Sequence, residues 1–200
     1  KKRDAKAFAV KATRATRASS PWSMDKIKVN GLNPEQTYQL TVKNKTGEII
    51  DQREFSSLNL NKEQVRFAAA SCIDDKFSKI QKNMWNRLIE KKPDVLFMIG
   101  DNVYSDRVSK KWGDANPDQI WSRYVETRNR LKIFRAKRLI PTLAAWDDHD
   151  YGKNNGDRNF KHKKLVAQIM SDFFAQEKVS GVYSHGPGTS SWLKAFGHNF

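Results

Sequence analysis

An apolar run that ends in a dense group of acids and an imidazole constrains this chain more than any other feature. Residues 139–145, Leu-Ile-Pro-Thr-Leu-Ala-Ala, lead through Trp146 to Asp-Asp-His-Asp at 147–150, and a Gly/Asn-rich loop follows. Charge buried without a partner is strongly disfavoured, so such a group at the end of a strand usually ligates a metal or moves protons. The alternative is a solvated turn, because Asp, Asn and Gly also favour turns.

Two earlier apolar runs end in polar side chains in the same manner. Residues 65–71 lead into Cys72, and residues 95–99 lead into Gly100-Asp101-Asn102-Val103-Tyr104. All three runs have the composition of strands covered on both faces. Strands alternating with helices predict an α/β fold in which helices pack on a sheet. The segments with helical spacing are residues 77–91, 118–137 and 160–176.

The expected helices also predict a core. Spacing places one set of apolar side chains on a single face of the first helix: Ile80, Met84, Trp85, Leu88 and Ile89. A second set is expected to be buried by the next helical segment: Ile120, Tyr124, Leu131 and Phe134. Trp85, Trp112 and Trp121 are assigned to the core and receive no functional role.

The ends of the three strands predict one shared site. Loops converge at the carboxyl ends of strands in α/β sheets, so we expect Cys72, Asp101, Tyr104, Asp148 and His149 to meet. Carboxylates and imidazole serve divalent metals, and a thiolate and a phenolate add ligands suited to ferric iron. Three further acids of these segments are interpreted as turn or supporting groups: Asp106, Asp147 and Asp150.

Common catalytic motifs of other kinds are absent from the sequence. No G-x-S-x-G nucleophile elbow occurs, and no P-loop for nucleotides. Asp101 has no second Asp two residues later, which disfavours an aspartyl-phosphate mechanism. A metal-assisted hydrolase remains, in which metals lower the pKa of a bound water and an imidazole protonates the leaving group.

The first part of the chain has a different character. Residues 26–56 alternate between apolar and polar side chains around turn signals at Asn30-Gly31 and Asn33-Pro34, which predicts a small antiparallel sandwich. The formal charge of +15 favours an anionic substrate or surface, although a solvated basic surface explains it equally well. No apolar run has the length of a membrane span.

Three segments together resemble the PhoD-like alkaline phosphatases, a branch of the calcineurin-like metallophosphoesterases. They are Phe67-Ala-Ala-Ala-Ser-Cys72, Pro93-Asp-Val-Leu-Phe-Met-Ile-Gly-Asp-Asn-Val-Tyr104, and Pro141-Thr-Leu-Ala-Ala-Trp-Asp-Asp-His-Asp-Tyr-Gly152. The resemblance implies a metallophosphatase-like β-sandwich core flanked by helices at residues 62–200. It also implies a partial immunoglobulin-like or fibronectin-like domain and linker at 1–61.

The same resemblance implies roles for individual residues. Metal ligands would be Cys72, Asp101 (bridging two metals), Tyr104 and Asp148, while His149 would contact the phosphate and act as the acid. Asn102 and Asn155 are expected to help bind the substrate. The implied cofactor is a dinuclear or multinuclear site holding Fe³⁺ and Ca²⁺, with other divalent metals as alternatives; calcium's preference for oxygen ligands fits the carboxylates.

The implied activity is hydrolysis of an anionic phosphate ester, monoester or diester, by a metal-activated water, in a periplasmic or secreted protein. The family's further metal-binding histidines are expected beyond Phe200, as in a chain that is a fragment. The alternative is a catalytically incomplete module that binds polyanions. No specific nucleic-acid partner is predicted, because no aromatic and basic residues interleave as in a nucleic-acid groove.

Overall fold

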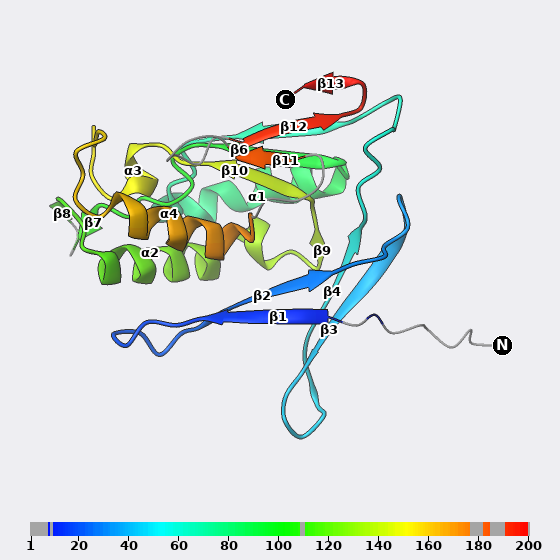
Figure 1. Ribbon diagram of the computed structural model, residues 1–200, viewed down its shortest axis with the longest axis horizontal. Coiled ribbons are helices and arrows are strands. Elements are labelled where there is room, and N and C mark those ends of the chain that lie inside the picture. The colour runs from blue at the N-terminus through cyan, green and yellow to red at the C-terminus, as the bar shows by residue number, and fades with distance from the viewer. Residues whose placement is uncertain (1–7, 9, 109–110, 177–181, 185–190, 200) are drawn as a thin grey trace.

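The computed structural model describes residues 8, 10–108, 111–176, 182–184 and 191–199, and shows a mixed α/β protein with several small sheets (Figure 1). The α/β class is as expected, while the β-sandwich core and the separate N-terminal domain stay predictions. Within these residues no helix is long and apolar enough to cross a membrane.

The central sheet has three parallel strands, with β6 (Val95–Ile99) between β5 (Phe67–Ala70) and β10 (Thr142–Ala145). Leu96 pairs with Ala68 on one side and with Thr142 on the other. Because all three strands run in the same direction, their carboxyl ends meet at one edge.

The single strand expected at 139–146 is two strands instead. β9 (Arg138–Leu139) pairs with β4 (Ile49–Ser56), and β10 starts at Thr142. Pro141 lies between them and has no N–H for a ladder, although its carbonyl accepts a hydrogen bond from Leu96 at 2.8 Å. The proline therefore divides the apolar run between two sheets.

Helices cover one face of the central sheet. They are α1 (Ser78–Glu90), α2 (Pro117–Arg130) and α4 (Lys163–Phe174). The 3₁₀ helix η1 (Asp75–Phe77) directly precedes α1, and η2 (Lys132–Arg135) follows α2. The large side chains of the core beneath them are buried as expected: Trp85, Leu96, Met98, Ile120, Trp121, Tyr124 and Leu131. Phe134 is partly buried against the same core.

The predicted apolar face of α1 is only partly correct. Trp85 is fully buried, but Ile80 and Met84 are 78% and 48% exposed. At 100° per residue, Ile80 lies about 140° around the helix from Trp85. Ile80 therefore belongs to the solvent side, and the core stripe of α1 is narrower than predicted.

The other face of the sheet is partly open. Leu193 and Ala195 of β12 (Ser191–Ala195) pack with Val95 in a second, smaller core on the side opposite α2 and α4 (Figure 1). Phe67 and Ile99 nevertheless remain 57% and 61% exposed. The expectation that both faces are covered is therefore wrong for this part of the sheet.

Smaller strand pairs surround this centre. β3 (Thr37–Lys43) pairs with β4, and the hairpin of β1 (Val10–Ala15) and β2 (Met24–Val29) packs beside α4. The remaining strands are β7 (Arg107–Val108), β8 (Lys111–Trp112), β11 (Val182–Ser184) and β13 (His198–Asn199), and the short helix α3 spans Asp148–Tyr151. Residues 26–56 thus form strands as predicted, and the boundary at residue 61 stays a prediction.

Candidate metal centre

The loops after β5 and β6 are joined directly at the carboxyl edge of the sheet. The Cys72 N–H donates to the Gly100 carbonyl at 3.2 Å, and the Ile73 N–H donates to the Asp101 carbonyl at 3.0 Å. These bonds hold Cys72 beside Asp101, although the two residues lie 29 positions apart in the sequence.

The backbone at this edge is unusual. Cys72 and Asp101 both have left-handed backbone angles, with φ of 55° and 52°, and Gly100 has φ of 116°. A Cβ at Gly100 would lie 2.8 Å from the Cβ of Asp147, so only glycine fits there. Non-glycine residues in this region cost energy and cluster at functional sites. The strained backbone of these loops therefore indicates a functional site. The spacing of the motifs in the sequence does not reveal this strain.

Three side chains form a group able to hold a metal ion. Asp101, Asp148 and His149 each offer a ligand atom, and these atoms lie within 4.8 Å of one another. The other two predicted residues are close: the Cys72 Sγ and the Tyr104 hydroxyl lie 3.8 and 3.5 Å from Asp101 Oδ2. The structure thus brings together all five residues that the strand ends predict, around Asp101.

The electrostatics of Asp101 fit a bound cation. Asp101 is buried, and its Oδ1 accepts no hydrogen bond from any described residue. Burial raises the pKa of its carboxyl. The charge and the backbone N–H of His149 act against this rise, while the charges of Asp148 and Asp147 add to it. Burial, followed by the charges of Asp101, Cys72 and Asp74, also raises the pKa of the Tyr104 phenol. A cation at Asp101 would reverse these effects by stabilising the anionic forms.

Asp106 supports His149 from within the protein. Its side chain is fully buried, and Oδ2 lies 2.8 Å from His149 Nδ1. A carboxylate in this position fixes the ring, which leaves Nε2 for another partner. The sequence predicts Asp106 only as a turn or supporting group. Its position directly after Tyr104 and Ser105, in the loop from β6, is the signal that links it to the site.

Aromatic rings enclose the same imidazole. The centroids of Tyr104 and Trp112 lie 4.3 and 5.0 Å from that of His149. Trp112 is 56% exposed, so its assignment to the core is wrong, whereas Trp85 and Trp121 are buried as predicted. Its place next to His149 depends on the pairing of β8 with β7, which residue type alone does not reveal.

The supporting acids hold the loop in place. Asp150 is fully buried and accepts hydrogen bonds from the N–H groups of Asn102, Val103 and Asp147 at 2.8–3.1 Å, while burial raises its pKa to about 7. Asp147 caps α3 by accepting from the Asp148 N–H. Both acids therefore act as the predicted turn and supporting groups.

The two asparagines predicted to bind substrate have different surroundings. Asn102 is fully buried, and its amide donates to the Ala145 carbonyl at 2.8 Å, which ties the β6 loop to β10. Asn155 is exposed, and its N–H donates to Asp148 Oδ2 at 2.5 Å. These contacts position the site, and a role of either residue with substrate stays a prediction.

Comparison with known proteins agrees with this geometry at the level of the fold. No family model and no curated protein matches the chain. Among solved structures, it is similar to PhoD, with a TM-score of 0.61 and 17% identity over 85% of this chain and 36% of that one. It is also similar to the purple acid phosphatase PPD1 from yellow lupin (Lupinus luteus) seeds, with a TM-score of 0.51 and 15% identity over 84% of this chain and 33% of that one.

The chain therefore spans about a third of the length of the structures that it matches. The structural match confirms the resemblance predicted from the three motifs. The described fold resembles part of the fold of PhoD and of a purple acid phosphatase.

Proposed function

We propose that this chain is the site-bearing part of a metal-dependent phosphoesterase that hydrolyses phosphate monoesters or diesters. One observation carries the proposal. The buried Asp101 has an oxygen without a partner among the described residues, at the strand end where Asp148, His149, Cys72 and Tyr104 converge. The similarity of fold to PhoD and to a purple acid phosphatase supports the same reading.

The residues that would hold the metals are Cys72, Asp101, Tyr104 and Asp148, with Asp101 shared between two ions. Thiolate and phenolate suit Fe³⁺, while the carboxylates suit Ca²⁺ or another divalent ion. When bound, such ions supply Lewis acidity at a phosphoryl oxygen and lower the pKa of a water. The chain itself contributes the rigid loops that keep these ligands in place.

His149 is proposed as the acid that protonates the leaving-group oxygen. Its Nδ1 is held 2.8 Å from the buried carboxylate of Asp106, so Nε2 is the nitrogen that can deliver a proton. In the doubly protonated ring that an acid requires, both ring nitrogens are donors, and the Asp106 carboxyl is in place to accept from Nδ1. Tyr104 and Trp112 pack beside the ring and restrict its rotation.

The direct test combines metal analysis with hydrolysis. We expect the purified chain to contain iron together with calcium or another divalent ion. It should hydrolyse p-nitrophenyl phosphate or bis(p-nitrophenyl) phosphate, and a chelator should remove metal and activity together. Protein that lacks metal after exposure to these ions, or hydrolysis unaffected by chelation, would contradict the proposal. Asp114→Asn, which changes an exposed acid elsewhere, should behave as the wild type.

The net charge of +15 favours a second candidate, a module that binds polyanions without catalysis. This candidate predicts binding to a polyphosphate or nucleic acid that weakens steeply as salt is raised, with no turnover. Turnover that disappears in Asp101→Asn would exclude it. The division at residue 61 and the exported location are proposed on the resemblance alone.

A further inference from the structure

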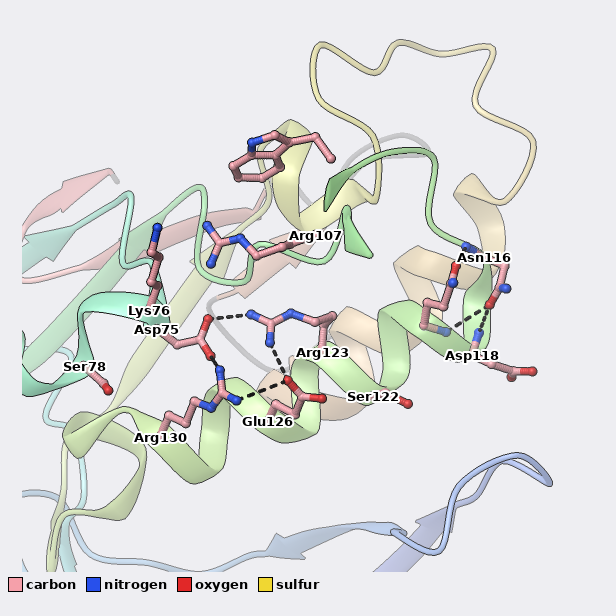
Figure 2. Close-up of a pocket in the computed structure, with 12 residues that line it drawn as sticks. Asp75, Lys76, Ser78, Arg107, Asn116, Asp118, Ser122, Arg123, Glu126 and Arg130 are labelled. Atoms are coloured by element: carbon pink, nitrogen blue, oxygen red, sulfur yellow. Dashed lines mark hydrogen bonds and ion pairs between the residues drawn. The ribbon is translucent and has the colours of Figure 1, made fainter. Parts of the chain in front are cut away.

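A pocket of about 1030 Å³ lies beside the candidate metal centre, between η1 and α2 (Figure 2). Trp112 lines the pocket, and its ring is centred 5.0 Å from that of His149. The guanidinium of Arg107, also on the wall, is stacked 4.9 Å over Trp112. The pocket would therefore lie next to a phosphate ester that is bound beside His149.

The acidic side chains that line the pocket form ion pairs with arginines. Asp75 pairs with Arg123 at 2.5 Å and with Arg130 at 3.0 Å, and Glu126 pairs with Arg123 at 2.5 Å. Figure 2 shows these four residues joined in one network along the wall. The third acid, Asp118, lies 3.3 Å from an arginine of the N-terminal region. The carboxylates of the pocket are thus neutralised within the protein.

Lys76 is the cation of this wall with no acidic partner among the described residues. Asp74 fixes its backbone, since Oδ1 accepts the Lys76 N–H at 2.9 Å, and the same carboxylate binds the Arg107 guanidinium at 2.8 and 2.5 Å. One acid therefore fixes the Arg107 guanidinium and the backbone of Lys76, whose ammonium lies 5.7 Å over the ring of Phe77. The hydroxyls of Ser78 and Ser122 also line the pocket, and neither has a hydrogen bond to the described part of the chain.

We propose that this pocket binds a second anionic group, a carboxylate or phosphate, on the organic part of the substrate, with Lys76 as its charge partner. The inference rests on the proposed function only in calling the ligand a substrate. The pocket and its charge do not depend on whether the protein catalyses a reaction. An ammonium suits this task because it is a compact charge with donors that rotate toward oxygen, and free hydroxyls add further donors.

The test uses pairs of ligands that differ by one distal charge. Phenylphosphonate and 4-carboxyphenylphosphonate are titrated into the full chain by calorimetry, and the corresponding phosphate esters are used for kinetics. We expect the carboxylated member to bind about tenfold more tightly, as for one charge-assisted hydrogen bond. Lys76→Gln should remove this preference, and Lys76→Arg should keep most of it.

Lys79→Gln is the matched control, because it removes the same charge from an exposed position of α1 that does not line the pocket. The preference should survive in this variant. Equal affinity for the two phosphonates in the wild type, or a preference that survives in Lys76→Gln, would overturn the inference. A preference for the carboxylated phosphonate in a chain without turnover would support the pocket while counting against the hydrolase.

Discussion

Two acids that follow strands of the same sheet show how differently this protein uses buried charge. Asp75, after β5, has a guanidinium on each oxygen, from Arg123 at 2.5 Å and from Arg130 at 3.0 Å. Asp101, after β6, has no partner for Oδ1 among the described residues, and Oδ2 has only Tyr104 and Cys72, at 3.5 and 3.8 Å.

We interpret this difference as that between a structural acid and the proposed metal ligand. Removing one partner of a buried pair leaves an uncompensated charge, so Asp75 is needed for stability. Among the described residues, Oδ1 of the buried Asp101 has no hydrogen-bond partner, which is costly unless a cation is present. The burial of an acid alone does not indicate a metal ligand, whereas an unpartnered oxygen surrounded by several other potential ligands supports one.

The largest expected effect is the loss of hydrolysis in Asp101→Asn. The amide keeps the size of the side chain but removes the charge that would bridge the metals. Metal catalysis is worth several kcal/mol, so kcat/KM should fall by about a thousandfold or more. Steady-state kinetics and metal content measure this. A variant that keeps its metal and its activity would show that Asp101 is only a structural acid.

The same substitution at Asp75 should affect stability instead. Asp75→Asn leaves Arg123 buried with an incomplete partner and should lower the free energy of unfolding by about 3–5 kcal/mol. Denaturant unfolding of the chelated protein measures it. Asp101→Asn should cause no such loss in the same assay. Asp118→Asn, at an exposed pair, is the control and should change stability by less than about 1 kcal/mol. Equal losses at positions 75 and 101 would remove the distinction.

Substitution of Asp106 tests whether its contact with His149 contributes to catalysis. Asp106→Asn keeps the shape of the contact but removes the charge that favours a protonated imidazole. Changes to such supporting partners typically cost about 10–100-fold in activity. We expect kcat to fall by this amount with little change in KM or metal content. An unchanged kcat would argue that the contact between Asp106 and His149 does not contribute to the chemistry.

The smallest effect is expected at Asp94, far from the centre. Partial burial alone would raise its pKa, but hydrogen bonds from the Arg66 N–H and the Lys62 ammonium outweigh burial and lower it. A lowered pKa in the folded state stabilises the protein above the unfolded pKa of about 4, and this stabilisation is lost as the pH falls through the folded pKa. Asp94→Asn should therefore cost about 1–2 kcal/mol at pH 7.

The difference between Asp94→Asn and the wild type should shrink as the pH falls below about 4. Urea titrations at pH 7 and at pH 3 measure it, and hydrolysis at pH 7 should be unaffected. A difference that persists at the lower pH would mean that the substitution acts through packing and not through charge.

The sequence predicts the parts of the fold and site that local patterns of residues determine. The three strands, the helices and the meeting of Cys72, Asp101 and Asp148 follow from apolar runs and from the convergence of parallel strand ends. Periodicity was less reliable for which side of a helix is buried, as Ile80 shows. It also could not reveal that Phe67 remains open on one side of the sheet.

Contacts between distant residues were beyond the reach of sequence patterns. Asp75 and Arg123 lie 48 positions apart, and nothing in either segment indicates the other. The pairing of Asp106 with His149 spans 43 positions and depends on how two loops fold over the same edge. Long-range ion pairs depend on three-dimensional packing, which local propensity does not encode.

Anomalous diffraction from crystals grown with iron and calcium tests the central claim most directly. We expect an anomalous peak at the iron edge within bonding distance of Asp101, next to the Cys72 Sγ and the Tyr104 hydroxyl. The peak should be absent from crystals of Asp101→Asn. A metal-loaded crystal with no peak at this strand end, and with Asp101 Oδ1 bonded to a protein group, would contradict the account.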